Sequence, residues 1–133
     1  MVQSDLEVAR EPRLRKSRRV LVVEDNLDTL HSLTYILRKE GHQVEFAING
    51  YAALEIARRF RPEFVFLDLG LPGIDGFDVC SQLKSEPGFR ATRFIAVTGY
   101  AQEDYRTRAR AAGCELHIVK PADPLLLLAL LET

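Results

Sequence analysis

Residues 64–76 read FVFLDLGLPGIDG, in which a short apolar run ends at Asp68 and a turn containing proline and three glycines follows. A strand that is apolar throughout is typical of a parallel sheet covered on both faces. Pro72 falls where a missing N–H does little harm, and Gly73 and Gly76 allow tight backbone geometry. The stretch therefore predicts a buried parallel strand with an aspartate at its carboxyl end.

The same pattern extends along the chain on both sides of this stretch. Four further strands are predicted, at residues 20–23, 43–47, 94–97 and 116–119. Between them apolar residues recur at helical spacing, as at Leu30, Leu33 and Leu37. Such alternation predicts an α/β fold: a three-layer, doubly wound, five-stranded parallel sheet. We expect the flavodoxin-like strand order 2-1-3-4-5, in which ligands collect where the order reverses.

Length and composition limit the classes of protein that need to be considered. The chain has 133 residues, enough for one hydrophobic core, and its 47% hydrophobic and 28% charged residues are typical of globular domains. Its apolar runs are too short for a membrane span, and residues 1–10 lack the pattern of a secretory signal. We therefore expect a cytoplasmic protein.

Charge and cysteine content indicate the domain organisation. Six of the 18 basic residues lie within residues 1–19, and the remainder of the chain is acidic. We interpret residues 1–18 as a basic leader or linker and residues 19–133 as one domain, and we expect no direct contact with nucleic acid or membrane. Cys80 and Cys114 lack the neighbouring ligands of a zinc site and are predicted to be reduced, buried thiols.

Functional side chains follow four of the five predicted strands. Glu24 and Asp25 follow the first strand, Asp68 the third, Thr98 the fourth and Lys120 the fifth. The predicted strand order brings the three carboxylates together, where they repel one another unless a cation is present. Mg²⁺ takes oxygen ligands and commonly bridges to phosphate. The pattern therefore predicts a magnesium site for phosphoryl transfer.

Four motifs in this order carry a resemblance to a known family. They are Val-Val-Glu-Asp-Asn at 22–26, Leu-Asp-Leu-Gly-Leu-Pro-Gly-Ile-Asp-Gly at 67–76, Val-Thr-Gly-Tyr at 97–100 and Val-Lys-Pro at 119–121. Together they resemble the receiver domain of two-component response regulators of the chemotaxis-regulator type. The resemblance covers residues 19–131.

The resemblance implies a role for each residue at the strand ends. Asp68 would be the phosphoryl acceptor, and Mg²⁺ would be held by Asp25, by Glu24 mainly through water, and by the backbone carbonyl of Gly70. Lys120 would pair with Asp68 and then with a phosphoryl oxygen. Thr98 would donate its hydroxyl to another phosphoryl oxygen. The family also usually has a cis peptide at the Lys-Pro step of residues 120–121.

The function implied is a phosphorylation-dependent switch in a two-component phosphorelay. The phosphoryl donor would be the phosphohistidine of a histidine kinase or phosphotransfer protein. The chain would act as a phosphoacceptor regulatory domain that assists its own phosphorylation and dephosphorylation, rather than as an enzyme. It would be either a single-domain regulator or the receiver segment of a larger protein such as a hybrid kinase.

Three features depart from the usual family pattern. His117 occupies the position of a Tyr or Phe that, in the family, rotates inward when the threonine moves. Two roles are open for His117, a part in the switch and a purely structural one. Gly70 and Tyr100, two positions beyond Asp68 and Thr98, predict slow loss of the phosphoryl group. The helix expected over residues 125–131 is apolar on every side, which predicts association through the fourth helix, fifth strand and fifth helix, with itself or with a neighbouring domain.

Simpler or rival interpretations remain for several of these residues. Asn26 is expected to cap the first helix, Asp28 to interact favourably with the dipole of that helix, and Asp75 to form the turn into the third helix. One rival function is a receiver-like interaction module that accepts no phosphate. The other is an aspartate-nucleophile phosphohydrolase of the haloacid dehalogenase type, which needs a second aspartate where Gly70 stands.

Overall fold

The structure, a computed structural model, describes residues 17–99 and 103–133. Its strands are β1 (Arg19–Val23), β2 (Gln43–Ala47), β3 (Phe64–Leu67), β4 (Arg93–Thr98) and β5 (Cys114–Val119). Its helices are α2 (Leu27–Lys39), α3 (Gly50–Phe60), α4 (Gly76–Lys84), the 3₁₀ turn η1 (Pro87–Phe89), α5 (Glu103–Ala112) and α6 (Pro124–Leu130).

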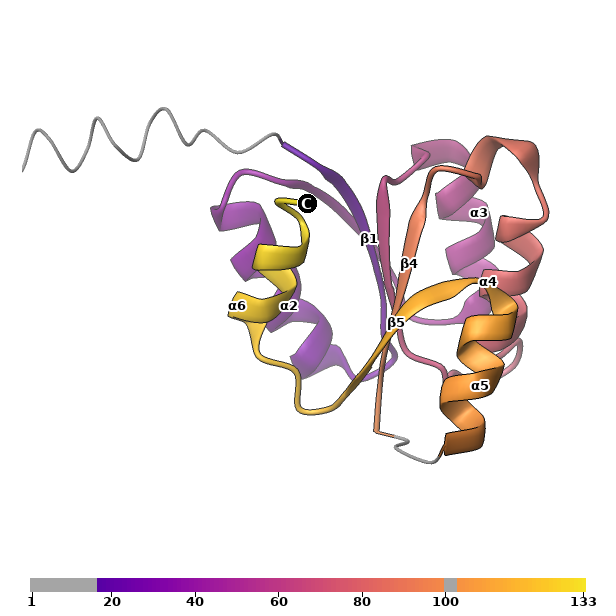
Figure 1. Cartoon of the computed structure of the whole chain (residues 1–133). Coiled ribbons are helices and arrows are strands. Elements are labelled where there is room, and N and C mark those ends of the chain that lie inside the picture. The colour runs from indigo at the N-terminus through magenta and orange to yellow at the C-terminus, as the bar shows by residue number, and fades with distance from the viewer. Residues whose placement is uncertain (1–16, 100–102) are drawn as a thin grey trace, which may run out of the picture.

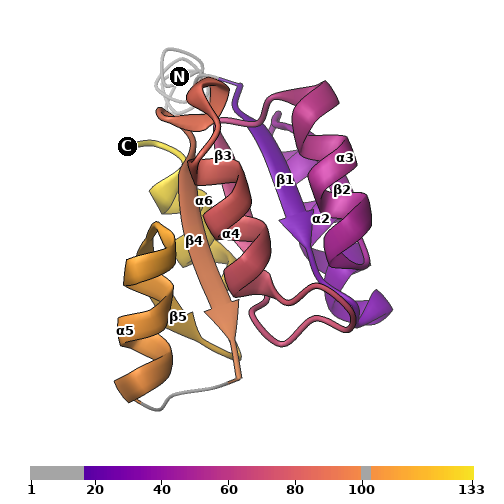
Figure 2. The same ribbon diagram turned by 90° about the vertical axis from the view of Figure 1, so that its right-hand side faces the viewer.

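The five strands form one parallel sheet in the order β2-β1-β3-β4-β5. Helices α2 and α6 cover one face of the sheet, as Figure 1 shows. Helices α3, α4 and α5 cover the other face (Figure 2). The observed strand order confirms the predicted three-layer fold and order. Consecutive strands of the chain are parallel, and the helix between each two of them is a crossover that packs on the sheet.

Side chains of the central strands enter two separate hydrophobic clusters. In β3, Phe64 and Phe66 pack in the cluster beneath α2 and α6, whereas Val65 and Leu67 pack in the cluster on the opposite face. All four are buried. Alternate residues of a strand point to opposite faces, so a strand buried on both sides has to be apolar at every position.

Side-chain caps begin α2 and α4, the helices that follow β1 and β3. The Asn26 side chain accepts a hydrogen bond from the Thr29 backbone N–H at 2.9 Å. The Asp75 side chain accepts one from the Asp78 N–H at 3.0 Å. Both satisfy N–H groups that have no partner within the helix. Asn26 is thus confirmed as a capping residue, and Asp75, predicted to form the turn into α4, also caps that helix.

The predicted leader lies mostly outside the described residues, which begin at residue 17. The Arg18 guanidinium donates to the Leu131 carbonyl oxygen at 2.8 Å and pairs with Glu63 at 3.3 Å. The folded domain thus includes contacts from the last residue of the segment interpreted as leader. Across residues 17–99 and 103–133, no helix has the length and apolar character that a membrane crossing requires.

Candidate functional site

The carboxyl ends of β1 and β3 place three acidic side chains beside one another. Val23 pairs with Leu67, and the Asp68 backbone N–H continues the ladder by donating to the Val23 carbonyl at 3.0 Å. Glu24, Asp25 and Asp68 each offer a carboxylate oxygen, and these oxygens lie within 4.8 Å of one another. The structure therefore brings together the three carboxylates that the sequence predicted to converge.

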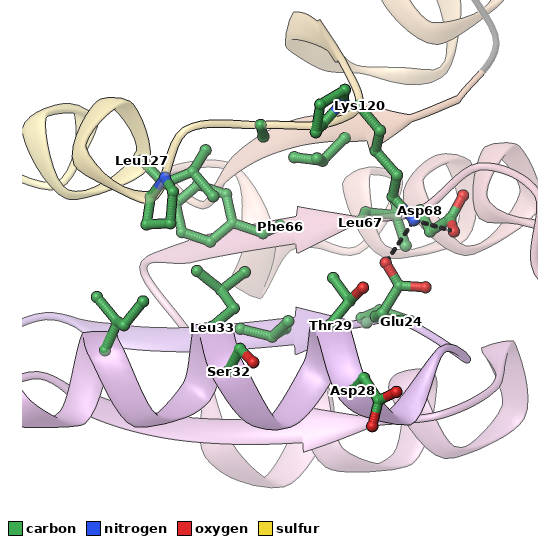
Figure 3. Close-up of a pocket in the computed structure, with 17 residues that line it drawn as sticks. Glu24, Asp28, Thr29, Ser32, Leu33, Phe66, Leu67, Asp68, Lys120 and Leu127 are labelled. Carbon is green, nitrogen blue, oxygen red and sulfur yellow. Dashed lines mark hydrogen bonds and ion pairs between the residues drawn. The ribbon is translucent and has the colours of Figure 1, made fainter.

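Lys120 lies between two of these carboxylates. Its ammonium donates to Glu24 Oε1 at 2.5 Å and to Asp68 Oδ2 at 2.9 Å, the two interactions dashed in Figure 3. The Lys120 backbone N–H also donates to the Thr98 carbonyl at 2.8 Å, which places the lysine directly after β5. The peptide bond from Lys120 to Pro121 is cis, as the resemblance implied. Thr98, at the end of β4, is fully buried.

The backbone around Asp68 holds its carboxylate and leaves little space. Asp68 Oδ1 accepts a hydrogen bond from the Gly70 N–H at 2.9 Å, and its side chain is only 11% exposed. Gly76 begins α4 immediately behind Asp68, where a Cβ atom would lie 2.5 Å from the Asp68 carbonyl oxygen and 2.6 Å from Leu69 Cα. Only glycine fits this close approach.

Burial and hydrogen bonding shift the pKa values of Glu24 and Lys120 in opposite directions. Glu24 is 5% exposed, and burial raises its pKa against the opposing hydrogen bonds from Lys120 and the Asn26 N–H. For Lys120, burial lowers the pKa, but the hydrogen bonds to Glu24 and Asp68 outweigh it and the net pKa is raised. Lys120 thus remains protonated and supplies a fixed positive charge.

The donor set of the three carboxylates fits a hard divalent cation. All the ligand atoms are oxygens, which Mg²⁺ and Ca²⁺ prefer, and Asp25 is exposed to solvent. Three carboxylates with one lysine leave a net negative charge when all are ionised. Glu24 Oε1 pairs with Lys120 and Oε2 accepts from the Asn26 N–H at 3.0 Å. Both oxygens of Asp68 are also hydrogen bonded, to the Gly70 N–H and to Lys120. The exposed Asp25 is therefore the most available direct ligand of the three.

Comparison with known proteins places this arrangement in a family. Residues 20–132 match the family described as "Response regulator receiver domain". The chain belongs to this family. Its relatives include the polar-differentiation response regulator DivK of Brucella anthropi, 34% identical over 77% of this chain and 83% of that protein. The protein PilH of Pseudomonas aeruginosa is 34% identical over 79% of this chain and 87% of that protein.

Solved receiver structures share the fold closely. The chemotaxis protein CheY4 of Vibrio cholerae superposes with a TM-score of 0.81 at 25% identity, covering 86% of this chain and 96% of that one. The receiver domain of the sensor histidine kinase PA1611 of Pseudomonas aeruginosa has a TM-score of 0.78 at 27% identity, covering 86% and 94%. That structure carries a magnesium ion coordinated in its active-site cleft.

The receiver domain has a cavity beside the acidic site that the sequence did not reveal. It has a volume of about 610 Å³ and lies between α2 and α6, with Leu33, Phe66 and Leu127 among its apolar walls (Figure 3). Glu24, Asp68 and Lys120 form its polar end, and Asp28, predicted only to favour the dipole of the first helix, also lines it. Such a cavity depends on how the short helix α6 packs relative to α2. The spacing of apolar residues in the sequence does not predict this packing.

Three predicted site residues lie outside the group of carboxylates and lysine or outside the described residues. His117 is half-buried in β5 and pairs with Ala96 of β4, so it lies on a strand next to the one that ends at Thr98. Gly70 is exposed directly after Asp68 and Leu69, where its carbonyl was expected to serve as a metal ligand. Tyr100 lies outside the described residues.

Proposed function

We propose that this receiver domain accepts a phosphoryl group on Asp68 from the phosphohistidine of a histidine kinase or phosphotransfer protein, with Mg²⁺ bound. The observation that carries the proposal is the Lys120 ammonium within hydrogen-bonding distance of both Asp68 and Glu24. A half-buried lysine between two carboxylates at the strand ends provides the charges that a transferring phosphoryl group requires.

In the proposed reaction, an oxygen of the ionised Asp68 carboxylate forms a bond to phosphorus. The bond from phosphorus to the donor imidazole nitrogen breaks, and its electron pair leaves with that nitrogen. No separate base is needed, because the nucleophile is already ionised. The Lys120 ammonium stabilises negative charge on a phosphoryl oxygen, and the Thr98 hydroxyl is proposed to donate to another.

Glu24, Asp25 and Asp68 are proposed to hold the Mg²⁺ ion, with the Gly70 carbonyl as a further ligand. When bound, the ion neutralises charge on the acidic cluster and on the phosphoryl oxygens. The closeness of the three carboxylates supports this assignment. The hydrogen bond from the Asn26 N–H orients Glu24, which suits a ligand that acts mainly through water.

Phosphorylation is proposed to act as a switch by changing the partners of Lys120. In the described structure the ammonium is shared between Glu24 and Asp68. A phosphoryl group on Asp68 adds negative charge beside it and gives Lys120 a stronger partner. Because the Lys120 N–H is bonded to the Thr98 carbonyl, a shift of Lys120 is transmitted to the ends of β4 and β5. His117 in β5 would respond to that shift, and the new conformation would bind a different partner.

The lifetime of the phosphorylated form is proposed to be long. Gly70 has no side chain with which to orient an attacking water, and its N–H is occupied by Asp68 Oδ1. A Gly70→Asn, Tyr100→Ala double variant is expected to lose the phosphoryl group faster than the wild type. Equal rates of loss, measured by intact mass over time, would remove this part of the proposal.

A separate proposal concerns association through α5, β5 and α6. Leu125 and Leu126 of α6 are 72% and 46% exposed, and Leu116 of β5 is 39% exposed. Exposed apolar side chains on adjoining elements favour contact with a second copy or a neighbouring domain. Light scattering should show association that Leu125→Glu abolishes. A strict monomer with and without a phosphate mimic would exclude self-association.

The experiment that tests the phosphoacceptor role is incubation with acetyl phosphate and Mg²⁺, followed by intact mass measurement. The wild type should gain about 80 Da, the mass of one phosphoryl group, and Asp68→Asn should gain none. Asp28→Asn, which removes an exposed carboxylate near the same cavity, is the matched control and should still gain the group. An unlabelled wild type would favour the interaction module, and release of phosphate without an adduct would favour a phosphohydrolase.

A further inference from the structure

The two cysteines of the chain lie in contact, although they come from different elements. Cys80 is in the middle of α4 and Cys114 is the first residue of β5. Their sulfur atoms are 3.5 Å apart, and the residues are 34 positions apart in the sequence. The chain contains no other cysteine, so each thiol has one possible intrachain partner for oxidation.

The surroundings of the pair favour closure without large movements. A disulfide has its sulfurs about 2.05 Å apart, so closure requires an approach of about 1.5 Å. Cys114 stands where the β4–β5 ladder is irregular: Phe94 pairs with Cys114, but Ile95 pairs with Leu116, leaving Glu115 as an extra residue. The irregularity leaves Glu115 outside the regular ladder, so fewer backbone hydrogen bonds oppose a small shift of the neighbouring Cys114.

We propose that Cys80 and Cys114 form an oxidation site at which a hydroperoxide produces a reversible intrachain disulfide. The disulfide would join α4 to the first residue of β5. This inference does not depend on phosphorylation of Asp68. Reversible disulfides of this kind are typical of redox-sensing sites.

The two thiols have different parts in the reaction. A hydrogen bond with Cys80 lowers the pKa of Cys114, although burial opposes it, whereas a hydrogen bond with Cys114 and burial raise the pKa of Cys80. Cys114 is also the more accessible of the two, at 4% exposed against 0% for Cys80. Because Cys114 keeps the larger exposed fraction, it is assigned as the thiol that meets the peroxide first, and its thiolate is the nucleophile.

The two steps are balanced in atoms and electrons. The Cys114 thiolate attacks one peroxide oxygen, the O–O bond breaks, and a sulfenic acid and one water (or alcohol) result after protonation. The Cys80 sulfur then attacks the Cys114 sulfur, the S–O bond breaks, and the hydroxyl leaves as water with the proton of the Cys80 thiol. Two thiols lose two electrons in total, and the peroxide is reduced.

The test is oxidation of the folded, reduced full chain with hydrogen peroxide. After denaturation and treatment with N-ethylmaleimide, the oxidised wild type should carry no maleimide and should be a monomer about 2 Da lighter than the reduced chain. Dithiothreitol should restore both thiols. Retention of two maleimide-reactive thiols, covalent dimers, or sulfinic acid as the main product would each overturn the proposal.

Single variants test the assigned order of reaction. With dimedone present, Cys80→Ala should accumulate a trapped sulfenic acid at Cys114. Cys114→Ala should form the Cys80 adduct about tenfold more slowly. Equal trapping in both variants would overturn the assignment of Cys114 as the first thiol. If either variant fails to fold, the mass of the oxidised wild type still tests whether the disulfide forms.

Discussion

The Lys120 ammonium lies 2.9 Å from the Asp68 carboxylate, although 52 residues separate the two in sequence. The contact exists because β3 and β5 both end at the same edge of the sheet, with only β4 between them. Glu24, from the end of β1, completes the group at 2.5 Å from the same ammonium. The parallel topology therefore makes one lysine the counter-charge for carboxylates from two other strands.

Removal of this lysine should destabilise the domain in the absence of metal. Lys120→Met leaves the buried Glu24 carboxylate without its charged partner, at an expected cost of about 1–3 kcal/mol in the free energy of unfolding. The expected loss is measured by urea unfolding in the presence of a chelator. Lys39→Met, at an exposed lysine of α2, is the control and should change stability little. Similar stability of both variants would show that the Lys120 pairs contribute nothing.

Binding of Mg²⁺ should stabilise the folded domain, and Asp25 should be needed for it. At about ten times its Kd, an ion that binds only the folded state adds roughly 1.4 kcal/mol to the free energy of unfolding. Asp25→Asn should remove most of this increment, whereas Asp28→Asn, outside the three-carboxylate cluster, should retain it. Thermal unfolding with and without Mg²⁺ measures both. If both variants retained the stabilisation by Mg²⁺, Asp25 would be excluded as a ligand.

Gly76→Ala should both destabilise the domain and disturb the phosphoacceptor. The added methyl group would meet the backbone of Asp68 and Leu69, and its accommodation should cost about 1–3 kcal/mol. Gly99→Ala provides the contrast, because a Cβ atom there has nothing within 4 Å. Equal unfolding midpoints for the two variants would contradict the close packing behind Asp68.

Glu63 should make stability depend on pH in the acid range. Burial raises the pKa of Glu63, but hydrogen bonds from the Arg19 backbone and the Arg18 side chain outweigh it, so the net pKa is lowered. The charged form therefore stabilises the fold above the unfolded pKa, about 4.3, and this contribution disappears as pH falls through the folded pKa.

The corresponding measurement compares wild type with Glu63→Gln over a range of pH. Because the Glu63 side chain is 34% exposed, solvent screening limits the expected difference at pH 7 to about 1 kcal/mol. The difference should shrink as the pH is lowered below about 4. A difference that stays constant across this range would show that the charge of Glu63 has no part in stability.

Sequence patterns were sufficient for the parts of the fold that depend on local periodicity. The uniformly apolar residues 64–67 predicted a strand buried on both faces, and the residues after each strand predicted the acidic cluster. Helix α5 was not delimited, because its sequence EDYRTRARAA is largely polar and only Ala109 among its described side chains is buried. The pairing of Lys120 with Glu24 and the cavity beside it depend on tertiary packing of α2, β5 and α6, which no local pattern encodes.

Chemical trapping of the phosphoryl group tests most directly whether Asp68 is the phosphoacceptor. After incubation with acetyl phosphate and Mg²⁺, borohydride reduction converts an aspartyl phosphate to homoserine, and peptide mapping identifies the residue changed. Homoserine is expected at position 68 alone, and none is expected when Mg²⁺ is removed with a chelator. Homoserine at another aspartate, or an unmodified Asp68 in a folded, metal-loaded domain, would contradict it.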